Sequence, residues 1–189
     1  IASAFIEGMN QAGMQATGKH FPGHGGIFAD SHLTFSQDTR SLLELESHDL
    51  LPFDALKFQL GGIMTAHISF TNIDKEIATF SKFWLQDILR NKIGFAGTIF
   101  SDDLSMKGSD YVGGIEAKVG KALESGCNMV LVCNDRPTAL EAINFLEKEK
   151  ISQSHKITKL KASQSISWTD LEKDERRKDI IGKLNAIEK

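Results

Sequence analysis

The chain has 189 residues, of which 41% are hydrophobic and 25% are charged, as is typical of one globular domain. Its formal net charge of -3 argues against a nucleic-acid partner, which would be bound by neutralising phosphates. Its apolar runs are all shorter than the ~20 residues of a membrane-spanning helix, so we expect no membrane partner.

The first predicted elements lead into an unusual loop. Apolar residues at helical spacing predict an amphipathic helix that ends at Gly13, and residues 15–19 predict a first strand. Residues 18–32 then contain three histidines, a lysine, an aspartate and four glycines. Pro22 and the glycines prevent a regular helix or strand there, so these titratable groups lie on a loop just after a strand. In α/β proteins such loops carry the chemistry.

The next part of the chain predicts two short helices and a second strand. Residues 41–44 have the Ser-x-x-Glu form of a capping box, which predicts the start of a helix that Pro52 interrupts. A second helical segment, 53–60, is followed by two glycines that are typical of a helix end. The apolar run after them predicts a strand that ends in His67.

A further helix and strand precede an acidic pair. Ser81 is placed to cap an amphipathic helix over residues 83–89, and residues 97–100 predict a third strand. Asp102 and its neighbour Asp103 follow directly at the end of this strand.

The last predicted strand contains both cysteines of the chain. A helix over residues 115–124 leads to a strand over 128–132, and Pro137 is well placed to begin the next helix. Cys127 and Cys133 flank this strand in an apolar run. They are typical of core residues in a reducing compartment, rather than of a disulfide or a metal site.

Strand and helix signals alternate four times, which predicts an α/β fold with a parallel sheet. Each predicted strand is followed by a polar residue, and these residues are His20, His67, Asp102 and Asn134. Polar residues at the carboxyl ends of all strands favour a TIM-like (β/α)8 barrel. A doubly wound sheet is the alternative. It would normally show a glycine-rich phosphate turn that opens a helix, and residues 20–26 do not open one.

The number of units is half that of a closed barrel, which takes eight units and ~250 residues. We therefore expect residues 1–150 to form the C-terminal half of a barrel, with about four β/α units. We expect residues 151–189 to form a C-terminal helical extension that packs on the barrel. The two outer strands would lack neighbours within the chain, and unpaired edges favour aggregation. We expect these edges to meet a missing N-terminal half or a second copy of the chain.

Four motifs then identify a family. They occur in one order along the chain: Lys-His-Phe-Pro-Gly-His-Gly at 19–25, Asp-Ser-His at 30–32, Met-Thr-Ala-His at 64–67 and Phe-Ser-Asp-Asp-Leu-Ser-Met at 100–106. Together they closely resemble the bacterial β-N-acetylglucosaminidases of glycoside hydrolase family 3, of the NagZ type. The resemblance covers roughly residues 4–144.

The resemblance implies a cytoplasmic TIM-barrel enzyme of peptidoglycan recycling. Such enzymes remove non-reducing terminal β-linked N-acetylglucosamine from muropeptides. They retain the configuration through a covalent glycosyl-aspartate intermediate and use no cofactor and no metal. The resemblance also implies that an N-terminal half would supply an aspartate and arginines that bind the sugar.

The resemblance also assigns roles to individual residues of this chain. Asp102 matches the catalytic nucleophile. His32 matches the acid/base, and Asp30, two residues earlier, matches the aspartate that holds it. Lys19 and His20 match a pair that binds the hydroxyl groups of the sugar.

The chemistry of these residues agrees with those roles. A retaining glycosidase needs an anionic nucleophile and an acid that protonates the departing oxygen. Asp102, at a strand end, can point into the barrel mouth as a carboxylate at neutral pH. An imidazole titrates near pH ~6.5, so His32 can donate and then accept a proton close to neutrality. Asp103 would point the other way, and we expect it to cap the turn that follows. His24 and His67 we expect to be structural or supporting groups.

Two other functions remain open at this stage. Barrels with histidines at strand ends often bind zinc, so a metal-dependent hydrolase is one alternative. Pro22 lies between His20 and His24, however, and prevents their presentation on one face of a helix. A non-catalytic half-barrel that serves as an assembly module is the other alternative. It would place no demand on Asp30, His32 and Asp102.

Overall fold

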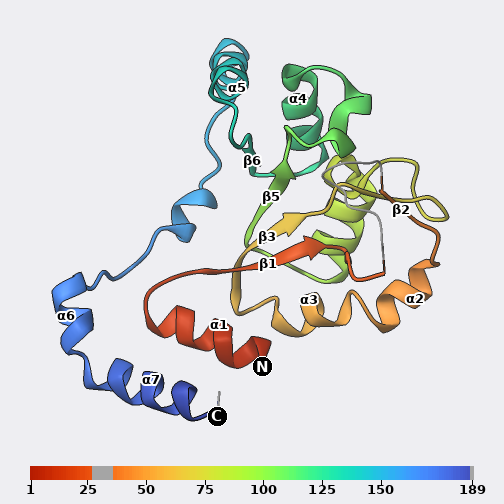
Figure 1. Ribbon diagram of the computed structural model, residues 1–189. Helices are drawn as coiled ribbons and strands as arrows, with labels where there is room; N and C mark the ends of the chain where they lie inside the picture. The colour runs from red at the N-terminus through yellow and green to blue at the C-terminus, as the bar shows by residue number, and fades with distance from the viewer. Residues whose placement is uncertain (27–35, 188–189) are drawn as a thin grey trace.

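The computed structural model describes residues 1–26 and 36–187, and its centre is a four-stranded parallel sheet (Figure 1). The strand order is β1-β3-β5-β6. The strands are β1 (Ala16–Phe21), β3 (Leu60–Thr65), β5 (Thr98–Asp103) and β6 (Met129–Leu131). A second, two-stranded parallel sheet pairs β2 (Ser36–Asp38) with β4 (Ile68–Phe70). The predicted α/β fold with parallel strands is confirmed.

Helices connect the strands and cover the sheet. The four strands lie between α3 and α4 in Figure 1, and α4 packs against α5 and β6. The helices of this part are α1 (Ala2–Gln11), α2 (Leu42–Ser47), α3 (Leu51–Leu56), η1 (Ala78–Phe80), η2 (Phe83–Lys92), η3 (Lys107–Val112), α4 (Ile115–Ser125) and α5 (Arg136–Lys148). Among the described residues, β1 and β6 each pair with a single neighbour, so both outer edges of the sheet are open.

Several helix ends follow from local sequence. The Ser41 hydroxyl accepts a hydrogen bond from the Glu44 amide, and the Glu44 carboxylate accepts one from the Ser41 amide, so the predicted capping box is present. The Ser81 hydroxyl accepts from the Trp84 amide at 3.0 Å at the start of η2. That helix is π-helical rather than α-helical, a difference that its amphipathic pattern does not reveal.

Two boundaries differ from the sequence prediction. Pro52 does not interrupt a helix but lies in the first turn of α3, where its missing N–H costs nothing. The glycines at 61 and 62 do not end a helix, because they lie inside β3. A Cβ on Gly62 would stand 2.7 Å from the Phe100 ring of β5, and one on Gly61 would stand 2.6 Å from the Gln15 side chain. Glycine is needed there because neighbouring side chains pack directly on the backbone.

The core lies between the sheet and the helices. Trp84 of η2 is fully buried, and its indole lies 5.0 Å from the Phe70 ring and 6.3 Å from the Phe21 ring, between ring centroids. Phe53 of α3 packs edge to face with Phe21, with 5.3 Å between the ring centroids. Burial of one such side chain contributes about 1.5–3 kcal/mol. These contacts hold the β1–β3 side of the sheet against the helices that precede and follow β3.

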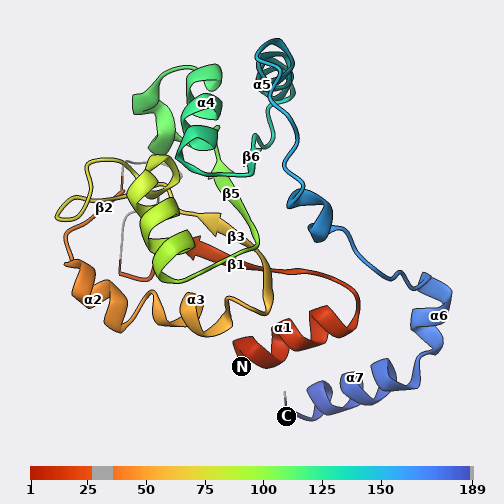
Figure 2. The ribbon, with the colours of Figure 1, turned by 180° about the vertical axis from the view of Figure 1, so that it is seen from behind.

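The tail after α5 contains η4 (Ile157–Leu160), α6 (Trp168–Lys173) and α7 (Glu175–Ile187). It runs away from the sheet and returns beside α1 (Figure 1 and Figure 2). The Ser163 amide donates to the Gly13 carbonyl at 2.9 Å, and the Arg176 guanidinium donates to the Gln11 side chain. None of the described side chains of α6 and α7 is buried. The division into a half-barrel over 1–150 and an extension over 151–189 stays a prediction.

Across the described residues, every helix is too short or too polar to cross a lipid bilayer.

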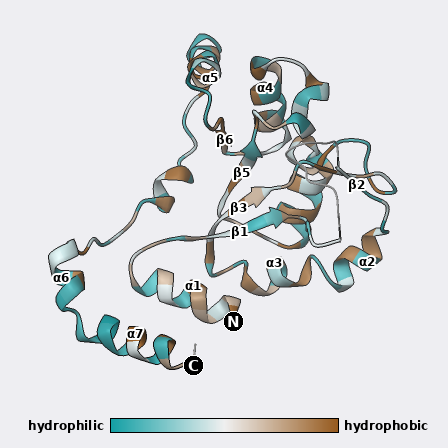
Figure 3. Ribbon diagram, viewed as in Figure 1, coloured by the Kyte–Doolittle hydropathy of each residue, from teal (hydrophilic) through white to brown (hydrophobic). Residues whose placement is uncertain are grey.

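Strand β1, at one edge of the sheet, is hydrophilic over much of its length (Figure 3).

A buried ion cluster joins β2 to the turn after α2. The Arg40 guanidinium donates to both carboxylate oxygens of Asp38 and, at 2.7 Å, to the Asp49 carboxylate. The Asp38 side chain is 4% exposed. Burial alone would raise the pKa of Asp38, but the hydrogen bonds from Arg40 outweigh it and the pKa is lowered. Gly23 fits against Asp49, where a Cβ would lie 2.4 Å from a carboxylate oxygen, so the same cluster also contacts the chain just after β1.

We expect Arg40→Met to lower the free energy of unfolding at pH 7 by about 1.5–3 kcal/mol, since it leaves the buried Asp38 carboxylate without its charged donor. Arg40→Lys should lower it less. Because the pKa of Asp38 is lowered in the folded state, the stabilisation is present above pH ~4 and is lost as the pH falls further. The difference between Arg40→Met and the unchanged protein should therefore shrink below pH ~4.

Urea unfolding, followed by the fluorescence of the buried Trp84, measures the free energy of unfolding of each variant at each pH. Lys183→Met is the matched control, because the Lys183–Asp179 pair is exposed on α7 and its loss should leave the stability unchanged. An equal effect of Arg40→Met at pH 7 and at pH 3 would contradict the assigned role of Asp38.

Candidate active site

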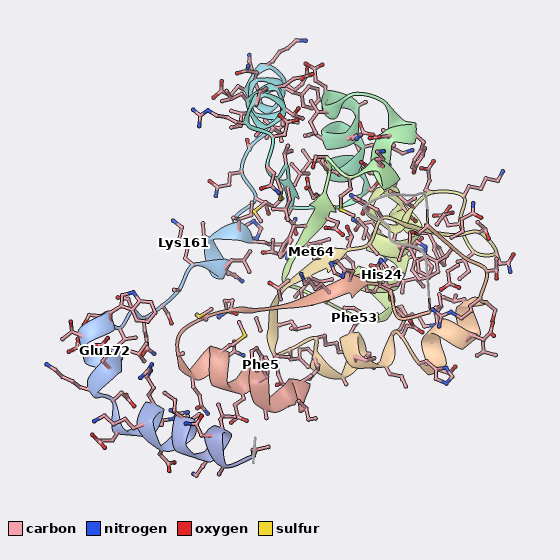
Figure 4. All side chains as sticks on the ribbon, in the orientation of Figure 1. Phe5, His24, Phe53, Met64, Lys161 and Glu172 are labelled. Atoms are coloured by element: carbon pink, nitrogen blue, oxygen red, sulfur yellow. The ribbon has the colours of Figure 1, made fainter. Side chains whose placement is uncertain are left out.

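Polar side chains from three strands meet at the carboxyl edge of the sheet. His20 lies near the end of β1, His67 follows β3, and Asp102 lies near the end of β5. The labelled His24 stands close to the tip of β1 in Figure 4, whereas Phe53 lies at the α3 side of the same strand. The carboxyl ends of parallel strands share one edge of a sheet, so residues far apart in the sequence come together there.

The Asp102 carboxylate is the centre of this group. One of its oxygens lies 3.8 Å from the His20 imidazole Nε2, and its side chain is 15% exposed. The other oxygen accepts a hydrogen bond from the Asp103 amide at 2.9 Å. A half-buried carboxylate that is fixed on one side and accessible on the other can act as a nucleophile or can stabilise a developing positive charge.

The neighbouring Asp103 has a different role. Its carboxylate accepts from the Ser105 amide and hydroxyl, at 2.9 and 2.7 Å, and from the Cys133 amide at 3.0 Å. Burial alone would raise the pKa of Asp103, but these hydrogen bonds outweigh it and the pKa is lowered. Asp103 thus caps the turn after β5, as expected from the sequence, and it also links this turn to the chain just after β6.

His67 is fully buried beneath the acidic pair. Its Nε2 lies 2.9 Å from the Asp103 carbonyl oxygen, and its Nδ1 lies 2.9 Å from the Thr79 hydroxyl. Burial lowers the pKa of the His67 imidazole, although the hydrogen bond to Asp103 and the charge of Asp102 act in the opposite direction.

The two histidines of the loop after β1 lie side by side. The rings of His20 and His24 are 5.9 Å apart between centroids and stand edge to face. Lys19 is exposed at the open edge of β1. It lines a cavity of about 640 Å³ together with apolar residues of α1 and α3, among them Phe5 and Phe53.

The structure brings together only some of the residues predicted for the site. His20 and Asp102 are neighbours, and Lys19 lies one position before His20. Asp30 and His32 lie outside the described residues. Within the part of the chain that the structure describes, no group of three or more histidine, cysteine, aspartate or glutamate side chains is arranged to hold a metal ion.

Two supporting residues escape sequence reasoning. The Thr79 hydroxyl contacts His67, and the Ser101 hydroxyl accepts from the Leu131 amide of β6 at 3.0 Å. Single hydroxyl residues carry no local signal of such a role. Only the tertiary arrangement places them against the carboxyl ends of the strands.

Comparison with known proteins gives evidence on the family of the chain that is independent of the site geometry. The family model described as the glycosyl hydrolase family 3 N-terminal domain matches residues 1–163. A β-hexosaminidase from Idiomarina loihiensis is 46% identical over 180 residues, which cover 93% of this chain and 54% of that protein. A β-hexosaminidase from Tolumonas auensis is 46% identical over 189 residues, 99% of this chain and 56% of that protein. The chain thus spans about half the length of these curated relatives.

Solved structures agree with the sequence comparison. NagZ from Neisseria gonorrhoeae in complex with N-trifluoroacetyl-D-glucosamine superimposes with a TM-score of 0.75 and 39% identity, over 87% of this chain and 47% of that chain. The native form of the same enzyme gives the same TM-score at 38% identity. With a family model that matches most of its length, and with the parallel sheet and strand-end carboxylate described above, the chain belongs to glycosyl hydrolase family 3.

Proposed function

We propose that the chain carries the nucleophile of a retaining β-N-acetylhexosaminidase. The observation that carries the proposal is the Asp102 carboxylate, half-buried at the end of β5 and 3.8 Å from His20 of β1. The curated relatives are named β-hexosaminidases, and one similar structure holds an N-acylated glucosamine derivative. We infer that the substrate is a muropeptide with a terminal β-linked N-acetylglucosamine.

In the proposed first step, an Asp102 carboxylate oxygen bonds to the anomeric carbon while the bond from that carbon to the leaving oxygen breaks. His32 gives its proton to the leaving oxygen, and Asp30 orients the ring and favours its protonated form. In the second step, water attacks the same carbon, its proton passes to His32, and Asp102 is released. Two displacements on one carbon retain its configuration, and no cofactor or metal takes part.

Two further residues of β1 are proposed to hold the sugar. Lys19 and His20 would contact its hydroxyl groups, and the position of His20 beside Asp102 supports this for His20. Hydrogen bonds to the sugar that strengthen in the transition state lower the barrier.

The open edges of the sheet support a partner. β1 and β6 each lack a second neighbour among the described residues, and the cavity beside β1 is lined by exposed apolar residues such as Phe5. We propose that these edges pair with an N-terminal half of the barrel or, as the alternative, with a second copy of the chain. The free thiols Cys127 and Cys133 are consistent with a reducing compartment, and we propose that the enzyme works in the cytoplasm in peptidoglycan recycling.

Replacement of Asp102 and replacement of His32 should lower the activity of the assembled enzyme in different ways. Asp102→Ala should abolish turnover of every substrate, because no covalent intermediate can form. His32→Ala should retain part of the rate on an aryl β-N-acetylglucosaminide, whose leaving group needs little protonation. On a muropeptide it should lose about 10²–10⁴-fold. Asp30→Ala should lower kcat/KM with the same substrate dependence as His32→Ala, but to a smaller extent. Measurement of kcat/KM for each variant on both substrates tests these roles.

An equal loss for His32→Ala on both substrates would show that His32 is not the acid. Turnover should also persist in the presence of a chelator, and its loss there would favour a metal-dependent hydrolase instead.

The open edges generate a second expectation. The chain alone should not hydrolyse an aryl β-N-acetylglucosaminide. A fusion protein should turn it over, in which the N-terminal part of the Idiomarina loihiensis relative, up to the start of the region that matches this chain, is joined to the N-terminus of this chain. The matched control is the same fusion with Asp102→Ala, which should assemble equally and remain inactive. Full activity of the monomeric chain, with its molar mass checked by light scattering, would contradict the need for a partner.

A further inference from the structure

The end of β5 is irregular at the position of Asp102. Phe100 pairs with Met129 and Asp103 pairs with Leu131, so three steps along β5 correspond to two along β6. The extra residue falls between these pairs, as in a β-bulge, and the Ser101 hydroxyl accepts the Leu131 amide that a regular ladder would bind through the backbone. Bulges redirect side chains, so the direction of Asp102 depends on how the chain is held just after the irregularity.

Asp103 is the residue that holds the chain there. Its amide donates to the Asp102 carboxylate, and its carboxylate caps the following turn. Its carbonyl oxygen faces the buried His67 ring at 2.9 Å. This carbonyl, which also accepts from the Met106 amide at 3.1 Å, belongs to the peptide group after Asp103, whereas the amide that contacts Asp102 belongs to the peptide group before it. The contacts with His67 and Asp102 therefore fix the backbone on the two sides of the Asp103 Cα, and loss of the His67 contact would leave the conformation of Asp103, and with it the position of its amide, less restrained.

The surroundings of His67 define its protonation. A carbonyl oxygen only accepts, so Nε2 must carry the hydrogen. Nδ1 of this tautomer is an acceptor at 2.9 Å from the Thr79 hydroxyl, whose single hydrogen it shares with the Ala66 carbonyl oxygen at 3.1 Å. The Thr79 oxygen in turn lies 2.8 Å from the Thr65 hydroxyl, which can donate to it. Burial lowers the pKa of the His67 imidazole, which favours the neutral ring, and the charged groups that face it are Asp102, Asp103 and Lys118. Each nitrogen of the ring thus has a partner: Nε2 has the Asp103 carbonyl at the end of β5, and Nδ1 has the Thr79 hydroxyl of η1.

We propose that His67 is a positioning residue for Asp102, which it orients through the Asp103 carbonyl while Thr79 holds its ring. The proposal rests on the proposed function, because it assigns His67 a role in directing the nucleophile. A role in core packing alone does not require these contacts. His67 stacks on the Phe80 ring at 6.1 Å, and an apolar ring could do the same without the cost of burying a polar imidazole.

The test compares two replacements of His67 in the assembled enzyme. His67→Gln keeps an N–H that can reach the Asp103 carbonyl, whereas His67→Phe fills the space and cannot donate. We expect His67→Phe to lower kcat on the order of 10²-fold with KM unchanged, since a misdirected nucleophile affects the transition state more than binding. His67→Gln should lose less than about 10-fold.

Ser109→Ala is the matched control. The buried Ser109 hydroxyl donates to the Leu104 and Met106 carbonyls in the turn after β5, so its loss disturbs the same region without touching Asp103. Ser109→Ala should lower the melting temperature and leave kcat unchanged. If His67→Phe and His67→Gln lower kcat equally, or if kcat follows the melting temperature across all three variants, the proposal is overturned.

A spectroscopic measurement separates this proposal from the proposed function. With histidines labelled with ¹⁵N, the resonance that disappears in His67→Gln should show a neutral ring with its hydrogen on Nε2. A hydrogen on Nδ1, or a charged ring at pH 7, would overturn the proposal whatever the activity. If Asp102→Ala retained activity, the proposed function would fail, and the ¹⁵N spectrum would still report the contact between His67 and Asp103.

Discussion

The need to pair every buried polar group at the end of β5 shapes this region of the molecule. A backbone N–H or C=O that is buried without a partner costs about 1–3 kcal/mol, so each such group must find one. Beyond the regular ladder, side chains supply part of the pairing: Ser101 accepts from an amide of β6, and His67 contacts the Asp103 carbonyl, which also accepts from the Met106 amide. Farther on, the buried Lys118 ammonium donates to the Leu104 carbonyl and to Asp110. The same contacts that satisfy the backbone also fix the direction of Asp102.

This constraint explains why the acidic pair divides its tasks. Asp103 accepts three hydrogen bonds from Ser105 and Cys133, which leaves its carboxylate occupied. Asp102 accepts a hydrogen bond from the Asp103 amide and faces His20 with its other oxygen. Two adjacent and identical side chains thus become a structural cap and an available carboxylate, because their carboxylates have different hydrogen-bond partners at the irregular end of β5.

Patterns that depend on neighbouring residues in the sequence predicted much of this arrangement. The capping box at Ser41 and the alternation of strands and helices are local signals, and the structure confirms both. The π-helical η2 and the glycines inside β3 were not foreseen, because they depend on what packs against them. Gly62 faces Phe100, a residue of another strand. The same holds for Arg40, whose two carboxylate partners are two and nine residues away and carry no recognisable motif.

The proposed acid also suits a nucleophile that is held this firmly. In glycosidases with two carboxyl groups, the acid must be kept protonated near neutral pH by an apolar pocket or by the charge of the other carboxylate. An imidazole already titrates near pH ~6.5 and can alternate between acid and base without such a pocket. A neighbouring carboxylate such as Asp30 is then enough to adjust the pKa of the imidazole, and the surroundings of the nucleophile do not have to serve the acid as well. A strand end that is fixed by backbone hydrogen bonds suits the proposed role of Asp102, since its carboxylate must be aligned to attack the anomeric carbon in the first step and to leave it in the second. In the proposed mechanism the acid/base therefore need not share the environment of the nucleophile, which is consistent with its position in a different β/α connection of the chain.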